Sequence, residues 1–166
     1  LVSLLRQNGV EAHIALVRTV QLGHEAQSPP SMWAFNHAIA YVPKLDLFLD
    51  GTAEQSGWKE IPTMDQGAVS LVVDGKNSRL TTIPLHPAED NLNTSDYVLT
   101  LQDDGALVVN GTERFHGQHN ANERRTFADP ATQRETLERQ LSQSINGAAV
   151  KKIEVSDLGL DKEEIH

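Results

Sequence analysis

Residues 35–54 read Phe-Asn-His-Ala-Ile-Ala-Tyr-Val-Pro-Lys-Leu-Asp-Leu-Phe-Leu-Asp-Gly-Thr-Ala-Glu, and this stretch decides how the chain is organised. It contains two β-type runs, His37–Val42 and Leu47–Asp50, which are joined by a short connection that begins with proline. Such a short connection predicts a hairpin, in which the start of the first strand lies beside the end of the second. We therefore expect His37 and Asp50 to lie in contact, although they are far apart in the chain.

A contact between a histidine and an aspartate has a specific chemical meaning. The carboxylate fixes the tautomer of the imidazole and stabilises its cation, as in a nucleophile–His–Asp triad. The chain contains no cysteine, so these residues offer no thiol nucleophile. Ser3, Ser28 and Ser31 are nucleophiles only by residue type, because none stands in a nucleophile-elbow pattern. The sequence thus predicts a base and its orienting acid without their nucleophile.

Each of these residues also has a simpler interpretation. His37 alone could be a core histidine with its hydrogen bonds satisfied, and Asp50, which precedes a Gly-Thr pair, could be an ordinary turn residue. Asn36 could help to position the site or could be a polar residue at the edge of a strand. Trp33 and Phe35 could wall a substrate groove, or they could pack into the core.

Charge and composition exclude several classes of protein. The 166 residues include 23 acidic and 14 basic side chains, which gives a net charge of −9. This charge opposes binding to nucleic acid or to an anionic membrane surface, and no local cluster of Lys and Arg counteracts it. No stretch approaches the roughly 18 apolar residues that a membrane span needs. We therefore expect no nucleic-acid partner and no membrane-spanning segment.

The elements around the hairpin predict a mixed α and β unit. Leu1, Leu4 and Leu5 share one helical face, and the helix that carries them ends at Asn8-Gly9. It is so short that we interpret it as the tail of a longer helix. The remaining predicted elements of this unit are a central strand over residues 10–20, a surface loop over 21–30, and a strand pair over 69–73 and 80–83.

Residues 84–94 are rich in Pro, Asn and acidic side chains and predict a linker, after which mixed apolar strands give way to hairpin-spaced strands. His116 and His119 have a spacing found among metal ligands, but the surrounding Gly, Gln and Asn residues favour a solvated loop. The second unit is predicted to contain strands over 97–101, 106–109, 112–116 and 150–155 and one helix over 130–145. We expect an α+β protein with two domains, residues 1–86 and 95–166, of which the second, possibly incomplete, is β-sandwich-like with one helix.

Four segments together resemble bacterial transglutaminase-like proteins. They are residues 1–19, 35–42, 49–53 (Leu-Asp-Gly-Thr-Ala) and 65–68 (Asp-Gln-Gly-Ala). The resemblance covers about the first half of the chain, and it implies a partial papain-like core that is followed by a β-rich C-terminal domain. It also implies a catalytic Cys upstream of Leu1, at the start of the helix that residues 1–7 would finish. His37 would then be the base and Asp50 the orienting acid.

The implied activity is Cys-dependent acyl transfer on protein or peptide carboxamides. The thiolate would form an acyl-enzyme that is released to water, by a peptidase or amidase, or to an amine, by a transglutaminase. The resemblance implies no cofactor and no metal, and it favours the bacterial periplasm or cell envelope. The competing hypothesis is a non-catalytic binding or scaffolding module with a structural triad remnant. The substrate and the oligomeric state stay open, and we expect this chain alone to be inactive.

Overall fold

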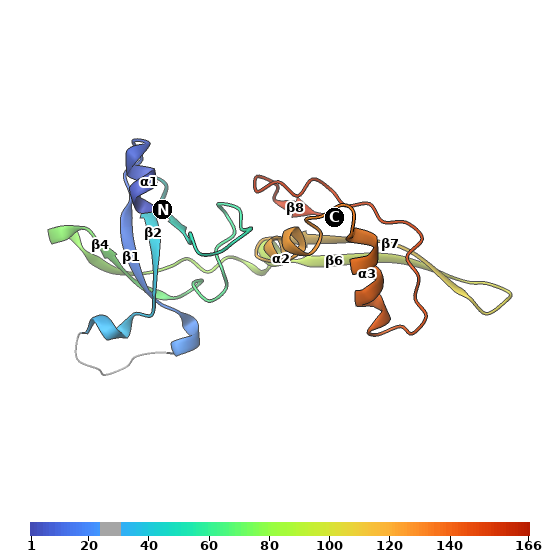
Figure 1. Ribbon diagram of the computed structural model, residues 1–166. Coiled ribbons are helices and arrows are strands. Elements are labelled where there is room, and N and C mark those ends of the chain that lie inside the picture. Colours follow the sequence, from blue (N-terminus) through green and yellow to red (C-terminus); the bar gives the residue numbers. More distant parts are fainter. Residues whose placement is uncertain (24–30) are drawn as a thin grey trace. The chain divides into compact units, whose positions relative to one another are not determined.

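The structure is a computed structural model that describes residues 1–23 and 31–166. The chain divides into two compact units, Leu1–Pro87 and Ala88–His166, which are described separately below. Among the described residues the secondary structure consists of α-helices and two antiparallel sheets, which agrees with an α+β class (Figure 1). Most of the loop predicted over residues 21–30, together with Ser28, lies outside the described residues.

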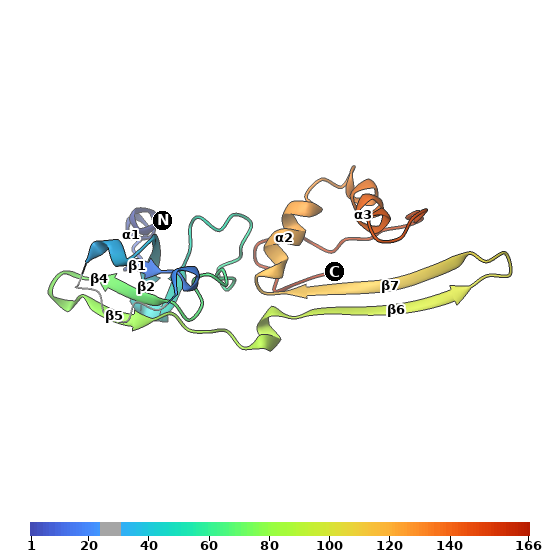
Figure 2. The same ribbon diagram turned by 90° about the horizontal axis from the view of Figure 1, so that it is seen from below.

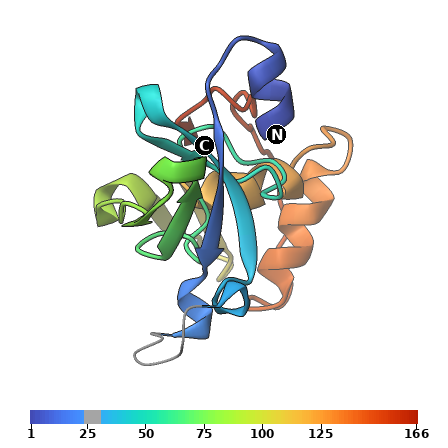
Figure 3. The same ribbon diagram turned by 90° about the vertical axis from the view of Figure 1, so that its left-hand side faces the viewer.

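The first unit contains a short α-helix and a five-stranded antiparallel sheet. Its elements are α1 (Val2–Gln7), β1 (His13–Arg18), β2 (His37–Val42), β3 (Leu47–Leu49), β4 (Val69–Val73) and β5 (Arg79–Thr82), with 3-10 turns at Val20–Leu22, Met32–Ala34, Pro43–Leu45 and Gly75–Asn77. The strand order is β3-β2-β1-β4-β5, so β1 lies at the centre, as the sequence predicted. Figure 3 shows β1 and β2 side by side, with α1 beside one end of them.

The hairpin predicted from residues 35–54 is confirmed. β2 and β3 pair antiparallel, with Tyr41 opposite Phe48 and Ala40 opposite Leu49. The chain reverses through a 3-10 turn to Asp46, whose φ of 47° is left-handed and whose carboxylate accepts a hydrogen bond from the Tyr41 hydroxyl at 2.7 Å. Short polar side chains tolerate this backbone conformation better than branched ones do. The second strand stops at Leu49, which leaves Asp50 just beyond the paired backbone.

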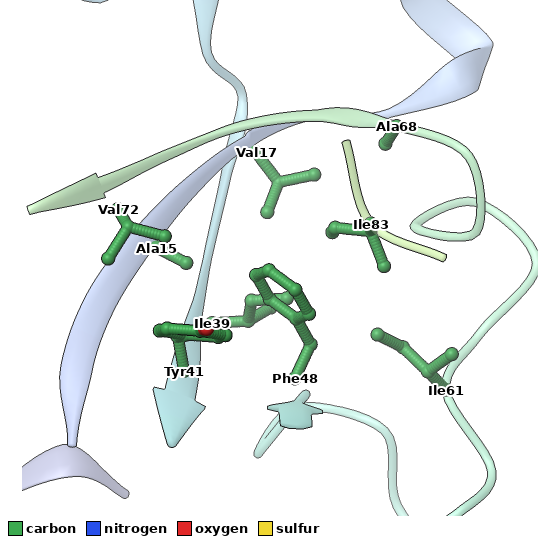
Figure 4. Packing of buried hydrophobic residues seen from close by; sticks show 9 residues of the cluster. All are labelled: Ala15, Val17, Ile39, Tyr41, Phe48, Ile61, Ala68, Val72 and Ile83. Carbon is green, nitrogen blue, oxygen red and sulfur yellow. The ribbon is translucent and has the colours of Figure 1, made fainter. Parts of the chain in front are cut away.

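A compact apolar core holds these strands in register. The rings of Tyr41 and Phe48 pack with centroids 4.7 Å apart at a tilt of 41°, and Ile83 and Ile61 complete the cluster from outside the strands (Figure 4). Burial of an aromatic or branched side chain contributes about 2 kcal/mol. The core therefore fixes the ends of β2 and β3, where His37 and Asp50 stand. The full cluster is Ala15, Val17, Ile39, Tyr41, Phe48, Ile61, Ala68, Val72 and Ile83.

The second unit has one small sheet and two helices. Its elements are a 3-10 turn (Ala88–Asn91), β6 (Asn93–Leu101), β7 (Leu107–His116), α2 (His119–Thr126), α3 (Gln133–Ser142) and β8 (Glu164–Ile165). β6 and β7 form a long two-stranded ribbon (Figure 2). β8 pairs only with the last two residues of β7. The expectation of a β-sandwich with one helix is wrong for this unit, because its strands form a single three-stranded sheet and do not face a second one.

Gly111 does not break the ribbon, contrary to the prediction of separate strands over 106–109 and 112–116. It pairs with Tyr97 in an unbroken β7. The Tyr97 ring lies where a side chain of Gly111 would stand, since an added Cβ would overlap Tyr97 Cδ1. An aromatic ring that covers a cross-strand glycine replaces the packing that the glycine lacks. Position 111 therefore requires glycine, because the ring of Tyr97 on the neighbouring strand β6 occupies the space of a side chain.

Three further predictions for this unit differ from the structure. No strand forms over residues 150–155, because β8 occupies the edge of β7 at Phe115 and His116 instead. His116 and His119 do not lie in a solvated loop: His116 ends β7 and contacts the carboxylate of Glu164 at 3.1 Å, and His119 begins α2. Helix α3 is shorter than the predicted helix over 130–145, since residues 130–132 form a turn before it.

Candidate functional site

His37 and Asp50 form a hydrogen-bonded pair at the open end of the β2–β3 hairpin. His37 Nε2 lies 3.1 Å from Asp50 Oδ2, so the predicted contact is confirmed. The His37 side chain is 18% exposed and that of Asp50 only 1%, so that the imidazole lies between solvent and a buried acid. With Nε2 bonded to the carboxylate, Nδ1 is the ring nitrogen that can act as a base. The catalytic roles of the two residues stay predictions.

Thr52 holds the Asp50 carboxylate in place. Its backbone N–H and its hydroxyl donate to Asp50 Oδ1 at 2.8 and 2.7 Å, an arrangement typical of an aspartate-initiated turn. Burial alone would raise the pKa of Asp50, but the hydrogen bonds from Thr52 and His37 outweigh it and lower the pKa below its ordinary value. Asp50 is therefore an anion at neutral pH, as an acid that orients a histidine must be.

Asp65 is a third member of this cluster, and its place there was not predicted from the sequence. It is completely buried, and each of the three residues offers a ligand atom within 4.8 Å of those of the other two. Neither Asp65 oxygen has a hydrogen-bond partner. Burial raises the pKa of Asp65 to about 6; His37 opposes this rise and the neighbouring Asp50 adds to it. Asp65 appeared in the sequence only as the first residue of the Asp-Gln-Gly-Ala segment.

The loop before β4 fixes the position of Asp65. The Asp65 backbone N–H donates to Pro62 O at 3.0 Å, and Asp65 O accepts from the Ala68 N–H at 3.1 Å. The next side chain, Gln66, donates to Ile61 O at 2.9 Å, and Ile61 is part of the core. These bonds fix the backbone of the loop and Ile61 anchors it to the core, so the Asp65 carboxyl group has little freedom to turn away from His37 and Asp50.

The three side chains can do two kinds of chemistry. His37 and Asp50 can move a proton to and from a bound group, which is general acid–base catalysis. One imidazole nitrogen and two carboxylates are also a ligand set that suits a divalent cation such as Zn²⁺. Among residues 1–23 and 31–166, these three residues are the one group of side chains placed to hold a metal ion.

The other two predicted site residues lie beside the cluster in sequence but are held differently. Asn36 exchanges two hydrogen bonds with Thr19, at 3.0 and 2.9 Å, and so joins the end of β1 to the start of β2. Trp33 is 93% exposed in a 3-10 turn, which excludes the interpretation of this aromatic as a core residue. Its role in a substrate groove stays a prediction, as does that of Asn36.

The start of helix α1 lies against the chain just after Asp50. A Cβ added to Gly51 would stand 3.3 Å from Leu1 Cβ and 3.4 Å from Leu1 Cδ2. The Leu1 side chain therefore lies close to the backbone that follows the buried acid. Leu1 and Leu4 are 50% and 61% exposed, so the apolar face of α1 is only partly covered.

Two further findings concern membrane-spanning helices and relatives of the chain. Within residues 1–23 and 31–166, no helix combines the length and the apolar character that crossing a membrane would require. Comparison of the chain with models of protein families, with curated proteins and with solved structures found no match.

Proposed function

We propose that the first unit supplies the His–Asp half of a transglutaminase-like cysteine acyl transferase or amidase that acts on protein or peptide carboxamides. His37 is the general base and Asp50 the acid that orients it. The observation that carries this proposal is the 3.1 Å bond from His37 Nε2 to an Asp50 carboxylate that Thr52 also holds. Because the chain contains no cysteine, the proposal requires a thiol from outside these 166 residues.

The reaction uses the two nitrogens of His37 for separate tasks. Nδ1 accepts the proton of the thiol, while Asp50 at Nε2 stabilises the imidazolium that forms. The thiolate then attacks the carboxamide carbon, the C–N bond breaks, and the imidazolium gives its proton to the leaving nitrogen. Water or a second amine attacks the resulting thioester, with His37 as base once more, and the thiol is released.

Two features of the first unit support this assignment. The antiparallel sheet places the histidine at the start of one strand and the aspartate just after the next, the order expected of a papain-like α+β core. The Leu1 side chain occupies the space beside Gly51, next to Asp50, which brings the start of α1 toward the turn that carries the acid.

The test compares this chain with a version extended upstream through the cysteine of the parent protein. Both are assayed for ammonia release from peptide carboxamides and for incorporation of a labelled amine. The extended chain is expected to turn over substrate, and His37→Ala is expected to lower its kcat by about 1,000-fold or more. The chain of 166 residues is expected to show no turnover.

Asp46→Asn is the matched control, because Asp46 lies at the other end of the same hairpin and bonds Tyr41 instead of His37. It should leave kcat unchanged. Turnover by the short chain that His37→Ala abolished would mean that a nucleophile lies within these residues and that the cysteine mechanism is wrong. An upstream Ala or Ser in place of Cys would favour the binding or scaffolding module.

A further inference from the structure

Asp65 is a fully buried carboxyl group that the proposed mechanism does not use. Neither of its oxygens has a hydrogen-bond partner, although its ligand atom lies within 4.8 Å of those of His37 and Asp50. A buried carboxylate without a partner is strongly unfavourable unless a positive charge stands beside it. The unpartnered oxygens of Asp65 therefore indicate a positively charged ligand at this place in the fold.

The Asp50 carboxylate is already oriented for a ligand at one of its oxygens. Oδ1 accepts both hydrogen bonds from Thr52, so that Oδ2 is left to face His37 Nε2 at 3.1 Å. Carboxylates that bind metal ions are typically held in this way by hydrogen bonds from neighbouring groups. In a tetrahedral Zn²⁺ site, with bonds of about 2.0–2.1 Å, neighbouring ligand atoms lie roughly 3.3 Å apart. The spacing of Nε2 and Oδ2 fits this geometry.

The donor set favours one class of cation. Two carboxylates and a neutral imidazole carry two negative charges, which a divalent cation balances. Mg²⁺ and Ca²⁺ prefer larger sets of oxygen ligands, whereas an imidazole nitrogen among few ligands suits Zn²⁺. The His37 side chain is 18% exposed and that of Asp50 only 1%, so the imidazole side offers the entry path that such a site needs.

We propose that His37, Asp50 and Asp65 bind one Zn²⁺ ion, through His37 Nε2, Asp50 Oδ2 and one oxygen of Asp65. Ligand atoms within 4.8 Å of one another need to move inward by roughly 1.5 Å at most to reach the tetrahedral spacing. The ion replaces the hydrogen bond between Nε2 and Oδ2, and the proton of the imidazole then lies on Nδ1. In the metal-free chain the charge of Asp65 stays unbalanced and opposes folding at neutral pH.

Zinc binding and catalysis compete for the same imidazole, a consequence that rests on the proposed function. With the ion at Nε2 and the proton on Nδ1, His37 has no free lone pair that could accept the proton of a thiol. The zinc-bound form is therefore an inactive form of the site, and release of the ion restores the base. The binding itself is a property of this chain and needs no thiol.

The test is a calorimetric titration of the metal-free chain with ZnCl₂, with Mg²⁺ and Ca²⁺ as comparison ions. The wild type should bind Zn²⁺ at one saturable site, and the other two ions at least about 100-fold more weakly. Asp65→Asn and His37→Ala should each weaken Zn²⁺ binding by at least about 100-fold, because each removes a direct ligand. Thr52→Val removes only the hydroxyl that holds Asp50 and should weaken binding by about 10-fold.

His116→Ala is the matched control, because His116 makes an imidazole–carboxylate contact with Glu164 at 3.1 Å in the second unit, outside the proposed site. It should leave the Zn²⁺ affinity unchanged. NMR of the histidine ring nitrogens locates the ion independently of any variant: the His37 Nε2 signal should move on addition of Zn²⁺, and the His116 signals should not.

Three results would overturn the proposal: no saturable uptake of Zn²⁺ by the wild type, an affinity that Asp65→Asn leaves unchanged, or Zn²⁺-induced shifts confined to histidines other than His37. If circular dichroism shows that Asp65→Asn does not fold, the NMR titration of the wild type and the affinity of Thr52→Val still decide the question.

These measurements need no turnover, so failure of the extended chain to act on carboxamides would refute the proposed function and leave the zinc site standing. In an active extended chain, Zn²⁺ should inhibit turnover, and Asp65→Asn should raise the half-inhibitory concentration by at least about 10-fold. Inhibition that Asp65→Asn does not relieve would show that the ion acts at the thiol, and the competition for His37 would then be wrong.

Discussion

The two units of this chain use their apolar residues in opposite ways. In the first unit, nine buried side chains from the sheet and its loops form one cluster. In the described part of the second unit, the buried apolar side chains are Phe127 and Ile165, while Leu99 and Leu101 of the ribbon are 61% and 73% exposed. Strand pairing alone gives a hairpin only marginal stability, and burial of a sheet face supplies the rest. The first unit can thus hold a site rigidly, and the ribbon lacks this support.

Amide hydrogen exchange should show the largest difference between the units. Amides of β1, which pairs on both sides within the core, should exchange about 1,000-fold more slowly than those of residues 98–108 in the ribbon, because few buried contacts oppose its local opening. Exchange measured by NMR or mass spectrometry, with rates corrected for sequence, tests this. Equal protection of the amides in the two regions would contradict this difference between the units, since the ribbon would then be as stable as the core.

Truncation of one apolar side chain should lower the free energy of unfolding by several kcal/mol more in the first unit than in the second. Phe48→Ala is expected to lower the free energy of unfolding of the first unit by about 3–5 kcal/mol, because it leaves a cavity against Tyr41. Leu99→Ala should change stability by no more than about 0.5 kcal/mol, because its side chain is exposed. Urea unfolding followed by Trp fluorescence reports the first unit alone, since the chain's two Trp residues, Trp33 and Trp58, lie there. A large effect of Leu99→Ala on any probe would show that the ribbon has a partner.

Asp65 should make the stability of the first unit depend on pH. Its folded pKa of about 6 exceeds the ordinary value of 3.8, so between these values the folded chain binds more protons than the unfolded chain. This group therefore lowers stability as pH rises through that window. Asp50 acts in the opposite direction, because its folded pKa is lowered. It stabilises the fold at pH values above its ordinary pKa, and this contribution is lost as pH falls.

Asp65→Asn should accordingly be more stable than the wild type at pH 7, by about 1–3 kcal/mol, since no charge is buried. The advantage should shrink as pH falls from about 6 to 4. Urea unfolding of both proteins at pH 4.5 and 7.5 measures the difference. An advantage that stays constant with pH would show that shape, and not ionisation, causes it.

The smallest effect is expected on the surface of the ribbon. Arg114 Nη1 lies 2.8 Å from Asp96 Oδ2, but the two side chains are 40% and 78% exposed. Exposed ion pairs of this kind contribute about 0–1 kcal/mol and are screened by salt. Arg114→Ala should therefore change the free energy of unfolding, followed by circular dichroism, by less than about 0.5 kcal/mol, and even less in 0.5 M NaCl. A larger loss would mean that this pair holds the ribbon together.

Local patterns in the sequence determined the β2–β3 hairpin, the contact of His37 with Asp50 and the central place of β1. Each depends on strand periodicity and on a short connection, which act between neighbours in the chain. The same patterns misjudged Gly111, because the ring that covers it comes from Tyr97 on the opposite strand.

Only the tertiary structure decided that Asp65 joins His37 and Asp50. An aspartate before Gln-Gly in a loop has the pattern of an exposed turn residue, and nothing within reach along the chain indicates its burial. Its position follows from the core, since Ile61 and Ala68 anchor the loop on both sides and bring the carboxyl group close to His37 and Asp50. The pairing of His37 with Asp50 is thus a short-range property of one hairpin, whereas the buried charge behind it is created by packing between segments that are distant in sequence.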